Sequence, residues 1–216
     1  MFYYFISLSI NCLSYLTNKG IHYRLLKFDD DTKLFWPVGS VEEVHKIRED
    51  LVKLSSWSAE WLMLFNIVKC KVLHAGKDSN KINYEMRGKM VDSLEEERDW
   101  GVIIISNLKV SKQCKKIVDT ANKVLVMIYR TFTYRTSEDL LLLYKSLVRP
   151  HLEYCIQAWR PFLKTDIDLL EKIQRRATRM MADIWEFNYE DRLSYLGLTT
   201  LEPRRLKEIS FTHLKS

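Results

Sequence analysis

Residues 40–64 repeat apolar side chains at helical intervals, and this periodicity is the clearest structural signal in the chain. Ser40 and Glu43 stand three positions apart where the repeat begins, the spacing of a capping box, in which each side chain satisfies a free backbone N–H. The pattern therefore predicts a helix over about 40–64. Lys69–His74 alternates polar and apolar residues and stops close to Gly76, which predicts a half-buried strand.

Three other segments of the first half favour strands. Residues 82–86 and 102–105 are short and rich in apolar or β-branched side chains, which is typical of strands. The segment up to Trp36 predicts an apolar helix or strand, a turn near residues 18–20, and then a strand pair around residues 29–31. Together with the helix, these strands indicate a small antiparallel sheet.

From Ser111 onward the periodicity is helical only. Apolar residues at positions 117, 118, 121, 124, 125 and 128 form one stripe of an amphipathic helix. Further helices are predicted from Ser137 towards Pro150, over about 165–182, around 189–196 and around 202–214, with Gly197 as a helix C-cap. The chain is therefore predicted to be α+β, with a mixed part over 1–108 and a helical part over 109–216.

The composition is that of a folded protein with an uneven charge. The 216 residues are 47% hydrophobic and 12% aromatic, which argues against disorder. Residues 1–108 contain 14 Lys/Arg and 15 Asp/Glu, a balance of −1, whereas residues 109–216 contain 20 and 13, a balance of +7. A basic second half suits contact with a polyanion, although such asymmetry also arises by chance in helical proteins.

The opening segment and the cysteines bear on the compartment. Met1–Leu16 is apolar, but it has no basic start and no small-residue cleavage site, and Asn11 interrupts it, so we interpret it as a buried core segment. The four cysteines lie far apart without metal-ligand spacing: Cys12, Cys70, Cys114 and Cys155. These features predict an intracellular protein of the cytoplasm or nucleus, with no membrane span.

Three consecutive carboxylates interrupt the apolar frame of the first segment, in the string Phe28-Asp29-Asp30-Asp31-Thr32-Lys33. Adjacent like charges repel, and a buried carboxylate needs a partner or a metal ion. Hard Mg²⁺ prefers carboxylate oxygens and often takes only one or two of them together with substrate phosphates. Taken alone, the string fits either a solvated acidic turn or a divalent-metal site at a strand turn.

Several strings in order along the chain resemble the reverse transcriptase of LINE-like retrotransposons that lack long terminal repeats, over about residues 5–212. The acidic string is similar to that family's Phe-Ala-Asp-Asp-Thr-Lys catalytic hairpin. The other matching strings are Trp57, Trp61, Met63, Phe65-Asn66, Lys69–His74 and Gly76; Glu97, Asp99, Gly101-Val102 and Asn107–Lys109; Tyr144–Tyr154; Gln174–Thr178; and Leu196–Leu198, Leu201-Glu202 and Arg204–Leu206.

The resemblance implies a fold, a chemistry and partners. Residues 1–108 would form a partial polymerase palm and residues 109–216 a helical thumb with the region that follows it. Asp30 would be the principal ligand of catalytic Mg²⁺, with Asp31 supporting it, for the two-metal transfer of a nucleotide from dNTP. The implied partners are an RNA template and a DNA primer.

Two departures from the family pattern bear on activity. Asp29 stands where the family has a small residue, so a third carboxylate adds repulsion to the pair. No acidic residue occurs from Met1 to Lys27, so the family's upstream catalytic aspartate has no counterpart. We therefore expect a C-terminal portion of an RNA-directed DNA polymerase that is catalytically incomplete by itself. The alternative is a non-catalytic basic helical module that binds nucleic acid or protein.

Basic residues give two weaker candidate sites. Lys69 and Lys71 could lie near the phosphates of an incoming nucleotide, or they could be solvated strand lysines. On the helix predicted over 165–182, one face could follow a nucleic-acid backbone or could equally be an ordinary solvated face. Its members are Lys172, Arg175, Arg176 and Arg179.

Overall fold

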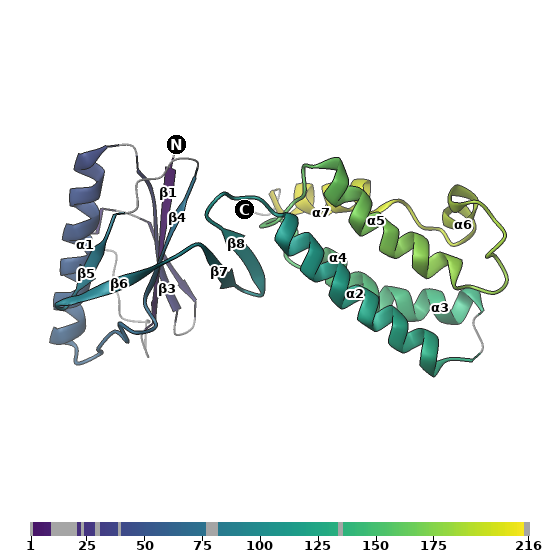
Figure 1. Ribbon diagram of the computed structural model, residues 1–216, viewed down its shortest axis with the longest axis horizontal. Helices are drawn as coiled ribbons and strands as arrows, with labels where there is room; N and C mark the ends of the chain where they lie inside the picture. The colour runs from purple at the N-terminus through teal and green to yellow at the C-terminus, as the bar shows by residue number, and fades with distance from the viewer. Residues whose placement is uncertain are drawn as a thin grey trace. The chain divides into compact units, whose positions relative to one another are not determined.

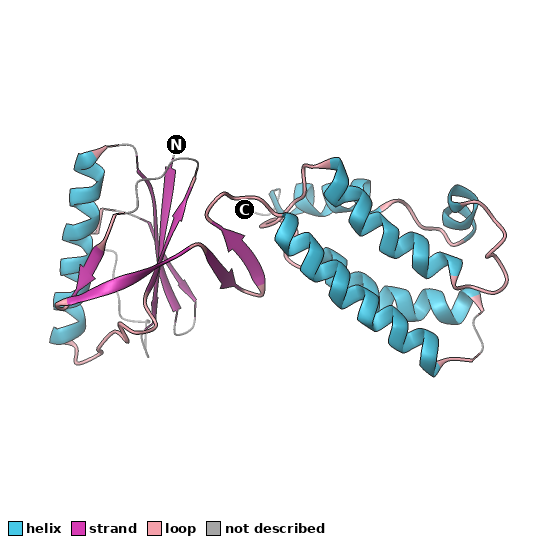
Figure 2. Cartoon of the chain, viewed as in Figure 1, coloured by secondary structure: helices cyan, strands magenta, loops and turns pink. Residues whose placement is uncertain are grey.

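The chain divides into two compact units, and each is described here by itself. The computed structural model describes residues 2–9, 21–22, 24–28, 31–38, 40–76, 82–133 and 136–213. One unit comprises Met1–Asp99 with Ile103–Lys109, and the other comprises Trp100–Val102 with Val110–Ser216. In the described residues the last strand ends at Ile105, and the elements from Ser111 onward are helices. Figure 2 shows both kinds of element, so the predicted α+β class is confirmed.

A six-stranded sheet forms the frame of the first unit (Figure 1). Its strands in chain order are β1 (Phe2–Ser9), β2 (Arg24–Phe28), β3 (Asp31–Val38), β4 (Lys71–Ala75), β5 (Tyr84–Met86) and β6 (Lys89–Leu94). Their spatial order is β2-β3-β1-β4-β6-β5. The opening segment, predicted as helix or strand, is therefore the strand β1, which pairs antiparallel with both β3 and β4.

The sheet is mixed, and the prediction of a purely antiparallel sheet was wrong. Strand β6 pairs parallel with β4 and antiparallel with β5, so it lies between two strands that precede it in the chain. Only Val91 of β6 is fully buried, so the strand lacks the alternation that reveals strands in a sequence. The sequence did not predict β6, which lies between β4 and β5 in the sheet. Its parallel pairing with β4 is what makes the sheet mixed.

Two tight hairpins have turn residues that do not predict a turn from the sequence. Arg87-Gly88 joins β5 to β6, and Trp100-Gly101 joins β7 (Glu96–Asp99) to β8 (Val102–Ile105). All four turn residues have positive φ, from 46° at Trp100 to 79° at Gly101, as a two-residue type I′ turn requires. Asparagine or aspartate usually precedes the glycine of such turns. An arginine or tryptophan at that position therefore does not predict a hairpin.

Helix α1 (Val41–Glu60) covers the sheet and supplies much of its core. The Glu43 N–H donates to Ser40 Oγ and the Ser40 N–H donates to a Glu43 carboxylate oxygen, so the predicted capping box is confirmed. Val44, Ile47, Leu51 and Leu54 of α1 pack on sheet residues such as Leu34, Val72 and Tyr84.

The second unit is a helical bundle whose core includes the fully buried Trp159. Its elements are α2 (Ser111–Thr131), α3 (Ser137–Leu143), the π-helical turn η1 (Tyr144–Val148), α4 (Arg149–Glu153), α5 (Lys164–Arg179), α6 (Tyr189–Tyr195) and α7 (Leu201–His213). Helices α2 and α5 pack against each other along their lengths (Figure 1).

The helix predicted from Ser137 towards Pro150 is interrupted. Between α3 and α4 the chain widens into η1, where the Arg149 N–H donates to the Tyr144 carbonyl, five residues back. Pro150 has no N–H to donate to the carbonyl four residues before it, and its ring clashes with an α-helical backbone at that point. A π-helical turn just before the proline relieves this conflict.

Helix α6 ends in a Schellman motif, which confirms the predicted C-cap at Gly197. The Leu198 N–H donates to the Leu193 carbonyl and the Gly197 N–H donates to the Ser194 carbonyl, at 2.9 and 3.2 Å. Gly197 has φ +59°, and an added Cβ would meet no atom within 4 Å. The glycine is therefore required for its backbone conformation and not for space.

We expect Gly197→Ala to lower the free energy of unfolding by about 1 kcal/mol, because an L-residue with a Cβ is strained in the left-handed region. Chemical denaturation followed by circular dichroism measures the change. Gly197→Asn is the matched control, because asparagine tolerates this conformation better, and it should lose less. Equal losses for the two variants would contradict the conformational explanation.

Candidate functional site

The predicted catalytic carboxylates belong to the hairpin formed by β2 and β3. The strands pair antiparallel with Phe28 opposite Asp31, so Asp29 and Asp30 are the two residues that join them. Asp29, Asp30 and the side chain of Asp31 lie outside the described residues. The strand pair predicted around the acidic cluster is confirmed, whereas its metal-binding role stays a prediction.

A buried carboxylate on α1 holds the chain just before this hairpin. Asp50 is fully buried, and its two oxygens accept hydrogen bonds from the His22 backbone N–H at 2.9 and 3.1 Å. The His22 ring nitrogen Nδ1 also lies 2.8 Å from Asp50 Oδ1, and Lys53 Nζ lies 3.5 Å from the same oxygen. The start of the hairpin is thereby fastened to the helix that covers the sheet.

A second charged contact holds β3 itself. The ammonium of Lys33 pairs with the carboxylate of Asp99, at the end of β7, and the two side chains are only 6% and 11% exposed. Lys33 and Asp99 both belong to strings of the family resemblance, which does not connect them. The pairing links positions 33 and 99, and nothing in the local pattern of either segment indicates the other.

The candidate nucleotide-phosphate lysines differ in their surroundings. Lys69 is exposed in the turn before β4, whereas Lys71 lies within β4 and pairs with Asp92 of β6 at 2.6 Å. Asp92 is 72% exposed, so this ion pair lies at the surface. Lys71 therefore has a structural partner across the parallel strand pair. Among the residues that the structure describes, Lys69 makes no comparable ion pair.

The four basic residues predicted to form one face of α5 are all exposed, but two of them are engaged on different sides. The Arg175 guanidinium lies 4.4 Å from the centre of the Tyr189 ring of α6. Arg176 instead donates to Asn122 Oδ1 of α2 at 2.9 Å. The predicted face is therefore divided between packing contacts, and Lys172 and Arg179 are its more available members.

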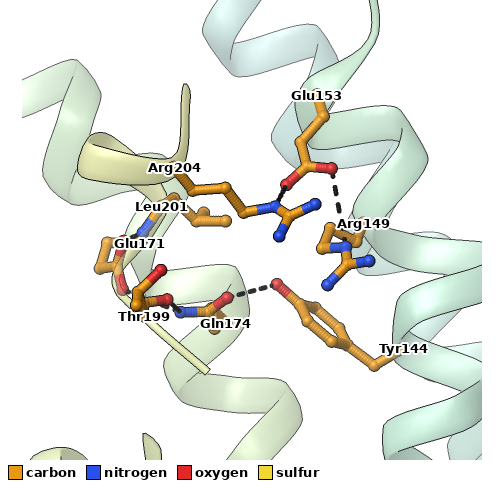
Figure 3. A network of polar contacts seen from close by, with 8 residues as sticks. All are labelled: Tyr144, Arg149, Glu153, Glu171, Gln174, Thr199, Leu201 and Arg204. Carbon is orange, nitrogen blue, oxygen red and sulfur yellow. Dashed lines mark hydrogen bonds and ion pairs between the residues drawn. The ribbon is translucent and has the colours of Figure 1, made fainter. Parts of the chain in front are cut away.

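A buried polar network joins η1, α5, α6 and the loop before α7 in the second unit. Figure 3 shows part of it. Its centre is Gln174, which is 1% exposed. The amide oxygen of Gln174 accepts from the Tyr144 hydroxyl at 2.8 Å, and its Nε2 donates to the Thr199 carbonyl at 2.9 Å and the Tyr189 hydroxyl at 3.0 Å. Gln174 belongs to a string of the family resemblance, but a single glutamine on a helix carries no signal of burial.

Glu171 completes this network and begins the last helix. Its carboxylate accepts from the Tyr189 hydroxyl and, at 2.9 Å, from the Leu201 N–H at the start of α7. Burial raises the pKa of Tyr144 above its usual range, and the nearby Tyr189 and Glu171 add to the shift. Burial and the hydrogen bond to Glu171 likewise raise the pKa of Tyr189, so both phenols remain neutral donors.

Beside the network, Glu153 of α4 contacts two arginines (Figure 3). It pairs with Arg204 of α7 and lies 3.6 Å from Nε of Arg149, four residues before it. One carboxylate thus holds two guanidinium groups from separate helices close together. This arrangement concentrates positive charge between α4 and α7.

The clustered arginines beside the network lend the second unit to anion binding. Across the described residues, no group of three or more His, Cys, Asp or Glu side chains is placed to hold a metal ion. None of the helices in the described ranges has the length and apolar character needed to cross a bilayer.

Cys70, Cys114 and Cys155 carry free thiols, and burial raises the pKa of Cys114 to about 11.

We expect Asp99→Asn to lower the free energy of unfolding by about 3 kcal/mol, because it removes one partner of a buried ion pair and leaves the Lys33 ammonium in a poorly solvated place. Denaturant titration of the full chain measures this. Asp92→Asn is the matched control at the exposed ion pair with Lys71, and it should cost about 0.5 kcal/mol. Similar losses in both variants would show that burial of the Lys33 pair has no energetic consequence.

Comparison with known proteins adds no relative to this picture. No protein-family model, curated protein or solved structure matches the chain. The residues and contacts of the chain itself therefore carry the functional inference.

Proposed function

We propose that the chain is the palm and thumb portion of a LINE-like RNA-directed DNA polymerase. The observation that carries this proposal is the pairing of β2 with β3, which leaves Asp29 and Asp30 as the joining residues and makes Asp31 the first residue of the returning strand. In the family that the sequence resembles, an acidic pair at such a hairpin holds the catalytic metal.

The chemistry assigned to the hairpin is in-line nucleotidyl transfer. Asp30 would be the principal Mg²⁺ ligand and Asp31 would support it. Mg²⁺ held there would supply Lewis-acid activation of the primer hydroxyl and charge neutralisation on the leaving pyrophosphate. Lys33, two residues after the acidic run, is already paired with Asp99. Its charge therefore stabilises the strand instead of competing with metal for the carboxylates.

The helical unit is assigned the nucleic-acid contact. Residues 109–216 carry a balance of +7, and exposed basic residues on α5 can neutralise phosphates and release their counterions. Arg175 and Arg176 also make packing contacts, so changing them would alter the bundle as well as its charge. Lys172 and Arg179 are the cleaner residues for a test.

We expect the chain to bind an RNA–DNA template–primer hybrid with an affinity that falls as salt rises, and Lys172→Gln/Arg179→Gln to weaken binding and flatten the slope by about two units. Fluorescence anisotropy at salt concentrations between about 50 and 200 mM measures both quantities. Over this range, binding through many phosphate contacts weakens by several orders of magnitude. Lys46→Gln/Arg48→Gln removes the same charge from exposed positions of α1 and serves as the control. An unchanged affinity and slope in the α5 variant would exclude α5 as the contact.

We also expect the chain alone not to extend a primer, because no carboxylate between Met1 and Lys27 can supply the second metal-binding position. Incorporation of labelled dNTP on a template–primer hybrid with Mg²⁺ measures this. Template-dependent synthesis that Asp30→Asn abolishes would overturn the expected inactivity while strengthening the polymerase assignment. Hybrid binding that is indifferent to Mg²⁺ and to Asp30→Asn would instead favour the non-catalytic basic module.

A further inference from the structure

We propose that a basic pocket in the helical unit is a binding site for a phosphate group. The pocket has a volume of about 390 Å³, within the range of roughly 300–1,000 Å³ that is usual for small-molecule sites. Its lining includes Lys145, Arg149, Gln174, Thr199, Arg204 and Lys207. Neither the acidic hairpin nor the four candidate basic residues of α5 line this pocket, so the site goes beyond the function proposed above.

The charge of the pocket is strongly positive. Lys145 and Arg149 come from the segment of η1 and α4, and Arg204 and Lys207 come from α7, which makes four cations. Glu153 contacts both arginines and offsets one charge, so these five residues together carry +3. Within the described ranges, neither Lys145 nor Lys207 has an acidic partner at ion-pair distance. Cations held this close repel one another, and a bound anion would relieve that repulsion.

The buried network fixes the floor of the pocket in advance. Gln174 donates to the Thr199 carbonyl and accepts from Tyr144, the residue next to Lys145. The Schellman turn at Gly197 sets the course of the same loop. Both cationic walls are thus attached to one buried amide, and little ordering of the backbone is needed when a ligand enters.

The residue types favour phosphate over a simple carboxylate. Two guanidinium groups offer planar pairs of N–H donors, which match phosphate oxygens, and two ammonium groups add charge without a fixed direction. Glu171 already accepts the Leu201 N–H at the start of α7, so the pocket depends on side-chain cations and not on the helix terminus. A ligand with several anionic oxygens uses all four cations, whereas a single carboxylate reaches fewer.

Such a phosphate could belong to a free polyphosphate or to the backbone of a nucleic-acid strand. Both present the same tetrahedral oxygens, and the pocket chemistry described here is common to them. A free pyrophosphate carries its charge in a small volume, whereas a strand presents one charge per phosphate and continues beyond the pocket. Competition between the two distinguishes the sources.

The test uses inorganic pyrophosphate as the probe and the full chain as the protein. We expect saturable binding by isothermal titration calorimetry, weakened about tenfold or more in Lys145→Gln/Lys207→Gln. These two lysines are the cationic lining residues outside the Glu153 cluster, so their replacement should leave the fold intact, which circular dichroism checks. Lys115→Gln/Lys123→Gln removes the same charge from exposed positions of α2 that do not line the pocket, and it should change affinity less than about twofold.

The competition experiment and the variants distinguish three outcomes: a backbone phosphate as ligand, a free polyphosphate as ligand, and no phosphate site. Displacement of pyrophosphate by a single-stranded oligonucleotide in the wild-type chain identifies a backbone phosphate as the ligand, whereas no displacement identifies a free polyphosphate. Equal pyrophosphate affinity in the pocket and control variants, or no pyrophosphate binding at all, would overturn the proposal. The probe does not require the α5 contact, so failure here and failure of template–primer binding are distinguishable.

Discussion

The helical unit depends on the full satisfaction of one buried amide. Gln174 lies on α5 with almost no solvent contact, and its oxygen and nitrogen bond to η1, to α6 and to the loop before α7. A buried amide without partners would cost about 1–3 kcal/mol for each lost bond, so these partners must arrive together. The result is a set of short helices whose ends are fixed relative to one another, although α6 has only seven residues.

In the first unit, buried charged side chains hold the strands at one edge of the sheet in place. The hairpin of β2 and β3 is fastened at its start by Asp50 and along β3 by the pairing of Lys33 with Asp99. A buried charge is costly unless it is paired, so each contact strongly disfavours alternative strand positions even where its net stabilisation is modest. These contacts fix the two strands that precede and follow Asp29 and Asp30 in the chain.

The helices could be predicted closely because their signals are local. The capping box at Ser40 and the C-cap at Gly197 each depend on residues within four positions, and both were found where the sequence indicated. The missed elements also have local reasons. Strand β6 buries one side chain fully, and the hairpin turns begin with Arg87 and Trp100 instead of the usual asparagine or aspartate.

The sequence by itself determined the α+β class, the positions of the main helices and the acidic hairpin, because periodicity, caps and turns are properties of neighbouring residues. Only the tertiary structure decided the parallel pairing of β4 with β6, the partnership of Lys33 with Asp99, the burial of Gln174 and the gathering of Arg149 with Arg204. Each of these depends on contacts between positions 15 or more residues apart, and the pairing energies depend on burial that no local pattern records.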